Sequence, residues 1–188
     1  MAKQLVSSLQ ISIFLLVILN LNPVFSSAKI GVDRIGSLVR ESCKNWTEFP
    51  NICISTLEAD SRSISVNTFP QLCRVAMEVA STRISETLSF ISQFQVNETD
   101  PTTQFYLKAC VRKYIAGTSL IEVNAIPAFD EKDFEEAYND VALVRQLVAD
   151  SECDDSSVTK LFNGRQTELI QFITDVVNLA DRQRRNPN

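Results

Sequence analysis

Apolar residues recur every three or four positions through four segments of this 188-residue chain, and this spacing constrains the fold more than any other feature. The clearest segment is residues 68–94, where the spacing places one apolar stripe along one side of a helix. The stripe consists of Phe69, Leu72, Cys73, Ala76, Val79, Ala80, Ile84, Leu88 and Ile91. No stretch of useful length alternates as a half-buried strand would, and Gly is scarce at 4 residues. The pattern predicts an all-α protein.

Three further segments share this period. One helix is expected from Pro101 to about residue 126, capped by Thr99 or Asp100, and a break at residues 126–130 should separate it from a helix capped by Asp130. The last helix should cover residues 167–184. The expected inward positions are Phe105, Ala109, Cys110, Tyr114, Gly117, Ile121 and Asn124, then Phe134, Ala137, Tyr138, Val141, Val144 and Val148, and finally Leu169, Ile170, Ile173, Val176, Val177 and Ala180. Helices joined by short connections pack antiparallel, so an up-and-down four-helix bundle follows.

Two shorter helical pieces precede these segments, in residues 30–60, with a turn at Pro50 between them. Cys43 lies in the first piece and Cys53 in the second. Helices this short are marginal alone in water. We therefore expect a helical hairpin in front of the bundle.

The first 28 residues differ from the rest of the chain. Lys3 precedes an apolar run at residues 11–19, which is too short to span a bilayer comfortably. Pro23 and the small residues Ser26 and Ala28 follow. This order predicts a secretory signal peptide over residues 1–28 and a mature, secreted domain over residues 29–188, with no membrane segment after cleavage. An uncleaved anchor is the alternative.

Five cysteines follow this leader. An oxidising compartment favours two disulfides and one free thiol, and the residues alone leave fifteen such arrangements open. Cys73 lies within the apolar stripe, where a free cysteine behaves as a small apolar residue, so we expect it to be the unpaired one. A reactive thiol at Cys73 is the alternative. Two sequons also predict N-glycosylation at Asn45 and Asn97.

Catalytic groups are poorly represented. The chain has no His, which removes the commonest general base and metal ligand. It also has no phosphate-cradling Gly loop, no nucleophile elbow and no Cys-x-x-Cys pair. We therefore expect no catalytic residue, no metal site and no cofactor. The formal net charge of −5 disfavours nucleic acid and favours a protein partner with a basic or neutral surface.

A family resemblance is carried by ordered residues across the mature chain. They are Leu38 with Cys43, Phe49-Pro50 before Cys53, Leu57 before Asp60, Leu107 with Cys110, Tyr114 and Ala116, Lys132-Asp133-Phe134 with Ala137, and Cys153-Asp154. In these positions the chain resembles the plant invertase/pectin methylesterase inhibitor family, and its invertase inhibitor-like branch in particular.

The resemblance implies a four-helix bundle with an N-terminal disulfide-bridged helical hairpin. It also implies the disulfides Cys43–Cys53 and Cys110–Cys153. Members of the family bind a pectin methylesterase, or a cell-wall or vacuolar acid invertase, as stoichiometric inhibitors in the apoplast or vacuole. A non-inhibitory carrier of lipid or another small ligand is the alternative, although the large apolar residues here would fill a bundle interior.

Invertase inhibitors of this family use a Pro-Lys-Phe motif beside a helix connection. Here Pro127, Lys132 and Phe134 are present but not contiguous, and Phe129 lies between them. These four residues are the predicted partner contact. The alternative is an ordinary helix connection whose apolar residues pack into the core.

Without His, a response to mild acid can come only from carboxylates with raised pKa values or from the partner. We therefore expect the stability of the fold to be nearly indifferent to pH between about 5.5 and 7.5.

Overall fold

The computed structural model describes residues 36, 38–149, 153, 162 and 164–187. The predicted leader, residues 1–28, lies outside this part of the chain, as do residues 150–152, 154–161 and 163. Every regular element among the described residues is a helix, which confirms the all-α class. None of the helices described combines the length and the apolar character that crossing a membrane requires.

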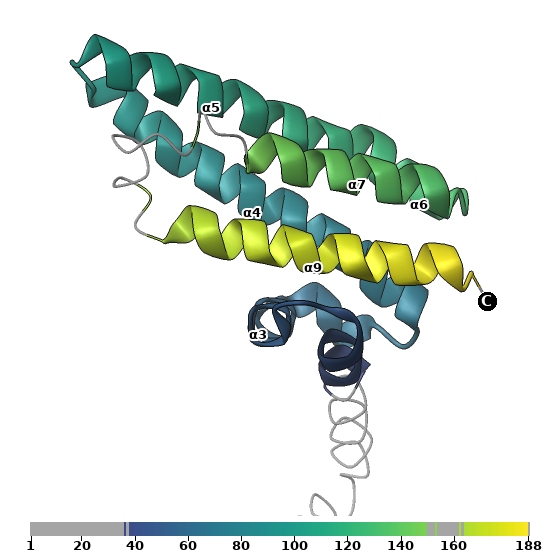
Figure 1. The fold of residues 1–188 in the computed structure, drawn as a ribbon. Coiled ribbons are helices and arrows are strands. Elements are labelled where there is room, and N and C mark those ends of the chain that lie inside the picture. The colour runs from purple at the N-terminus through teal and green to yellow at the C-terminus, as the bar shows by residue number, and fades with distance from the viewer. Residues whose placement is uncertain (1–35, 37, 150–152, 154–161, 163, 188) are drawn as a thin grey trace, which may run out of the picture. The chain divides into compact units, whose positions relative to one another are not determined.

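Four long helical rods form the bundle (Figure 1). The first is α4 (Phe69–Asn97), the third is α7 (Phe134–Val148) and the fourth is α9 (Arg165–Arg185). The second rod is α5 (Pro101–Leu120), which continues through the π-helix η2 (Ile121–Ala125) into α6 (Ile126–Asp130). Helices α4 and α7 each pack against both α5 and α9, so the predicted up-and-down four-helix bundle is confirmed.

The core lies between these four rods. It includes most of the predicted α4 stripe, and the largest fully buried side chains include Tyr114, Phe172 and Leu107. Gly117 faces α7 from α5, and a Cβ added there would lie in ordinary van der Waals contact with Val144 at 3.5 Å and Val148 at 3.7 Å. The space between the two helices would therefore accept an alanine at this position.

Two residues of the second rod do not face inward as predicted. Phe105 is 60% exposed, because the buried face at the start of α5 runs through Thr103 and Leu107, on the opposite side of the helix. Asn124 is exposed because a π turn needs more residues to complete than an α turn, which rotates it away from the core. The predicted inward positions were based on regular α-helical spacing along the whole rod.

The predicted break at residues 126–130 is also wrong, because these residues form α6. Pro127 lies inside the continuous rod, just after the π-helix η2, and the backbone is helical on both sides of it. The chain turns instead at residues 131–133. The cap of α7 is Asp133, whose Oδ1 accepts a hydrogen bond from the Glu136 amide at 3.0 Å, and Asp130 does not serve as the cap.

The N-terminal hairpin consists of helical residues 38–46 and of α3 (Pro50–Ala59), followed by the 3₁₀ turn η1 (Ser61–Ser65). Helix α3 packs against α9 (Figure 1). Asp175 of α9 reinforces this contact, since its Oδ1 accepts hydrogen bonds from the amides of Glu48 at 3.1 Å and Phe49 at 2.8 Å. The start of α3 is therefore capped by a side chain from the bundle.

The disulfides in the structure join the pairs that the family resemblance implies. Cys43 is bonded to Cys53, with 5.7 Å between their Cα atoms, and Cys110 of α5 is bonded to Cys153, with 5.2 Å. Cys73 is free and buried, and its thiol lies 3.5 Å from the Leu179 carbonyl. Burial raises the pKa of the Cys73 thiol, so the nucleophilic thiolate is disfavoured.

Candidate functional site

The turn between α6 and α7 is built by two backbone hydrogen bonds. The Lys132 amide donates to the Phe129 carbonyl at 3.0 Å, and the Asp133 amide donates to the Ala128 carbonyl at 2.8 Å. Together they form a Schellman motif, which ends a helix with one residue in the left-handed conformation. That residue is Lys132, with φ of 67°.

Lys132 is the only residue other than glycine with a positive φ among those the structure describes, and its side chain is exposed. The left-handed conformation costs an L-residue with a side chain about 1 kcal/mol, and Gly is the usual occupant. Strained backbone at an exposed position is a recognised sign of a functional residue. The outlier makes Lys132 a candidate contact residue on structural grounds as well.

The four predicted contact residues divide into two pairs. Phe129 is only 6% exposed, and its ring meets the half-buried ring of Phe134 edge to face, with 5.0 Å between centroids. Pro127 and Lys132 are exposed. The aromatic pair therefore anchors the turn to the core, as the alternative interpretation has it for Phe129. The exposed pair is left to meet a partner.

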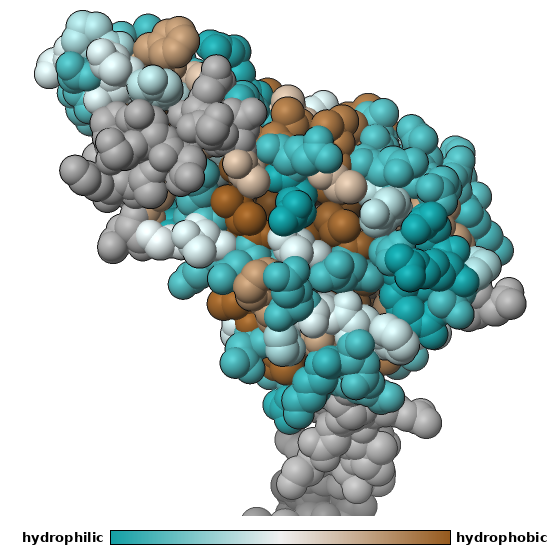
Figure 2. Space-filling view, in the orientation of Figure 1, coloured by the Kyte–Doolittle hydropathy of each residue, from teal (hydrophilic) through white to brown (hydrophobic). Residues whose placement is uncertain are grey.

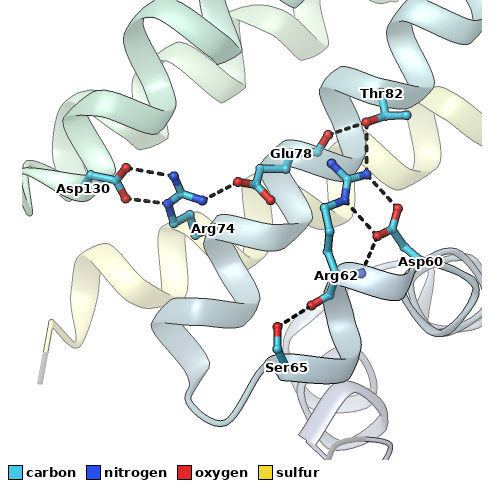
Figure 3. A network of polar contacts seen from close by, with 7 residues as sticks. All are labelled: Asp60, Arg62, Ser65, Arg74, Glu78, Thr82 and Asp130. Carbon is cyan, nitrogen blue, oxygen red and sulfur yellow. Dashed lines mark hydrogen bonds and ion pairs between the residues drawn. The ribbon is translucent and has the colours of Figure 1, made fainter.

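The end of α6 is fastened to α4 by an ion pair (Figure 3). Arg74 of α4 binds both oxygens of Asp130, with Nε to Oδ1 at 2.6 Å and Nη2 to Oδ2 at 3.0 Å, and it also contacts Glu78. A two-pronged guanidinium–carboxylate pair fixes direction as well as distance. Lys132, two residues beyond Asp130, is thus presented from a braced helix end.

The turn carries an acidic surface. Its exposed acidic residues are Asp130, Glu131, Asp133, Glu135 and Glu136. Arg74 pairs with Asp130, and Arg184 pairs with Glu135 at 2.8 Å, which leaves three carboxylates around one lysine. Figure 2 shows mostly hydrophilic residues over the right-hand end of the molecule, where α6 lies. Such a surface complements a basic partner.

Asp175 is the carboxyl that sequence reasoning missed. It is fully buried, and burial raises its pKa to about 6, although the Phe49 and Glu48 amides donate hydrogen bonds that oppose this rise. A carboxyl whose pKa is raised into this range argues against the expectation of a fold that is indifferent to pH between about 5.5 and 7.5. Asp175 is not part of the predicted inward stripe of α9 and faces the start of α3 instead, so the apolar period carried no signal for it.

A cavity of about 610 Å³ opens between α3, α4 and the start of α9, away from the turn. Its buried lining consists of Thr87, Phe162, Leu169 and Phe172, and charged residues such as Arg83 and Glu168 also line it. None of the four predicted contact residues lines it. Within the described ranges, no cluster of three or more His, Cys, Asp or Glu side chains is arranged to hold a metal ion.

Comparison with known proteins points to one family. The family model described as plant invertase/pectin methylesterase inhibitor matches residues 37–178. Among solved structures, the chain is similar to a pectin methylesterase inhibitor from Arabidopsis thaliana, with 18% identity and a TM-score of 0.48 over 76% of this chain and 95% of that one. No curated protein matches the chain.

Proposed function

The chain belongs to the plant invertase/pectin methylesterase inhibitor family, and we propose that it inhibits a pectin methylesterase or an acid invertase by forming a one-to-one complex. Members of this family are inhibitors rather than enzymes. The observation that carries the proposal for the contact site is the strained, exposed backbone of Lys132, which projects from the end of the bundle. In this proposal Lys132 and Pro127 touch the target enzyme.

Rigidity supports this role. The Phe129–Phe134 ring pair and the Arg74–Asp130 ion pair hold the turn, and a disulfide ties Cys110 in α5 to Cys153. A preorganised surface loses little conformational entropy on binding, so more of the contact energy is expressed as affinity. The turn is therefore suited to act as a fixed wedge.

Charge suggests which enzymes are the better candidates. The carboxylates around Lys132 favour a target with a basic rim at its substrate cleft, and the attraction should speed association at low ionic strength. We propose that residues 1–28 direct secretion and that the mature domain, residues 29–188, acts in the cell wall or the vacuole. Both classes of target enzyme act in these compartments.

The direct test is titration of the mature protein, residues 29–188, against a purified pectin methylesterase and a purified acid invertase at mildly acid pH. We expect one of the two activities to fall to near zero close to an equimolar ratio, because the complex is stoichiometric. If micromolar protein leaves both enzymes fully active, the proposal is wrong.

A truncation pair tests the contact site. Lys132→Ala should weaken inhibition at least tenfold, or by roughly 1.4 kcal/mol of binding free energy, because the contact made by the lysine side chain is lost. Lys108→Ala is the matched control, since Lys108 is an exposed lysine near the other end of α5 and the truncation is the same. Equal inhibition constants for the two variants would show that Lys132 does not contact the target. The proposed inhibitory function would not be affected by that result.

A further inference from the structure

The connection between α4 and α5 forms the other end of the second rod, and one sequon lies there. Asn97 is the last residue of α4, and Glu98 has extended backbone with φ of −76° and ψ of 128°. Asn97 and Thr99 are both exposed. The sequon therefore leaves the helix at an accessible tip, where its two recognised side chains are open to solvent.

The amide of Asn97 has a free position for a substituent. Its Nδ2 donates to the Gln93 carbonyl of the same helix at 3.2 Å. An amide nitrogen carries two hydrogens, so one remains available. Replacing that hydrogen with a sugar leaves the bond to Gln93 in place.

Two large apolar side chains are exposed on the helices that this turn joins, among polar residues of the same tip. Val96, next to Asn97, is 84% exposed, and Phe105, one turn into α5, is 60% exposed. Leaving large apolar side chains in water is unfavourable, and a cover reduces that contact. A flexible, hydrated glycan on the adjacent residue would be such a cover.

We propose that Asn97 carries an N-linked glycan that shields the exposed side chains of Val96 and Phe105 at the tip of the α4–α5 hairpin. The donor is a lipid-linked oligosaccharide pyrophosphate. The bond from the first sugar carbon to the pyrophosphate oxygen breaks, a bond from that carbon to Nδ2 forms, and the amide loses one proton. The lipid pyrophosphate leaves with the electron pair of the broken bond.

The second sequon differs in its surroundings. Asn45 is helical and lies within the loop that the Cys43–Cys53 disulfide closes. The hydroxyl of Thr47 donates to the Cys43 carbonyl at 2.6 Å, and the ring of Trp46 lies 4.4 Å from the Arg182 guanidinium. Closure of this loop competes with modification, so occupancy is lower at Asn45 than at Asn97.

A glycan at Asn97 is compatible with the proposed contact at Lys132. The helical rod from Pro101 to Asp130 separates the two ends, on the order of 40 Å at 1.5 Å per residue. Figure 1 shows the α4–α5 connection at the upper left and α6 at the opposite end. The modification and the inhibitory contact therefore occupy different ends of the bundle.

Occupancy is tested by expressing the full chain in plant cells and mapping its peptides after enzymatic deglycosylation in heavy-oxygen water, which marks each formerly glycosylated Asn as Asp. We expect the mark at Asn97 in most molecules, and in a smaller fraction at Asn45. An unmarked Asn97 overturns the proposal, whatever the reason for the missing glycan. Equal or greater marking at Asn45 overturns it as well. Inhibition is not measured here, so this result is independent of the proposed function.

Shielding is tested with a matched pair at Thr99. Thr99→Ala destroys the sequon and Thr99→Ser keeps it, while Asn97 is unchanged in both. We expect the Ala variant to self-associate in light scattering and the Ser variant to remain monodisperse, and Val96→Ser added to the Ala variant should restore monodispersity. Identical scattering from the Ala and Ser variants, with occupancy lost only in the former, contradicts the shielding role.

Discussion

The two ends of the rod formed by α5, η2 and α6 are alike in local chemistry. Each is a turn of three residues, and each ends on an aspartate that caps the next helix. Asp100 accepts a hydrogen bond from the Thr103 amide at 2.7 Å, and Asp133 accepts one from the Glu136 amide at 3.0 Å. The cap alone therefore does not distinguish the two ends.

What packs behind each turn does distinguish them. At the α6–α7 end the ring of Phe129 is buried, and Asp130 is held by Arg74. At the α4–α5 end Val96 and Phe105 are exposed. Cap residues therefore decide where the chain turns, whereas tertiary contacts decide whether the residues beside the turn are buried and paired or left exposed.

The largest expected difference concerns the aromatic residues. Phe129→Ala should lower the free energy of unfolding by about 3–4 kcal/mol, because it leaves a cavity behind the turn, while Phe105→Ala should change it by less than about 0.5 kcal/mol. Urea unfolding of the mature protein measures both. An equal loss of unfolding free energy in the two variants would contradict the difference in packing between the two ends.

The second expectation concerns how the free energy of unfolding depends on pH, which should follow Asp175 and not the cap Asp100. The Thr103 amide lowers the pKa of the exposed cap Asp100, which is ionised throughout mildly acid conditions, whereas burial raises the pKa of Asp175 to about 6. The folded state holds a proton on Asp175 that the unfolded state has already lost, so stability falls as pH rises through 6. We expect a loss of about 1 kcal/mol between about pH 5.5 and 7.5.

Asp175→Asn should flatten this profile, because the amide oxygen can still accept the bonds from Glu48 and Phe49 without ionising. Asp100→Asn is the control at the α4–α5 end, and it should leave the slope between the two pH values unchanged. A slope that survives in the Asp175 variant would assign the response to another group, such as Asp140, whose pKa is also raised by burial.

The left-handed backbone of Lys132 is a further difference between the two turns. Lys132→Gly should raise the free energy of unfolding by about 0.5–1 kcal/mol, since Gly relieves the left-handed strain and loses part of that gain to the entropy of the unfolded chain. It should also weaken inhibition if the lysine touches the target. Glu131→Gly, in ordinary helical backbone one residue earlier, should lower stability instead.

The smallest effect on stability is expected at Arg74. Arg74→Met should lower the free energy of unfolding by less than about 1 kcal/mol, because Arg74 and Asp130 are 38% and 47% exposed and solvent screens their attraction. Inhibition should fall more than stability, since the end of α6 loses its brace. Arg83→Met removes a similarly exposed ion pair on α4 and should leave inhibition unchanged.

Helix content, helix order and the buried stripe of α4 were predictable from the sequence, because they depend on apolar period and on cap residues that act within a few positions. Pro127 misled the prediction of the turn, since the backbone is helical on both sides of it. The apolar spacing did not indicate the π-helix at Ile121–Ala125. Asn124, which lies in this π-helix, is therefore exposed although it was predicted to face inward.

The sequence predicted which segment holds the candidate site, but not which of its residues are exposed. Lys132 and Phe134 were identified from the resemblance, but their separate roles depend on burial, which the order of residues does not contain. Asp175 shows the same limit, because its pKa is raised by burial and lowered by the Phe49 and Glu48 amides, which lie more than a hundred residues earlier in the chain.

By itself, the sequence determined that this chain forms a disulfide-containing helical bundle of the inhibitor family, because helical period and cysteine order are properties of the chain alone. Only the tertiary structure decided which end of the bundle is braced, which aromatic rings are buried and which carboxyl has a pKa raised by burial. The physical reason is that burial and pairing arise between residues far apart in the chain, and these set both rigidity and charge.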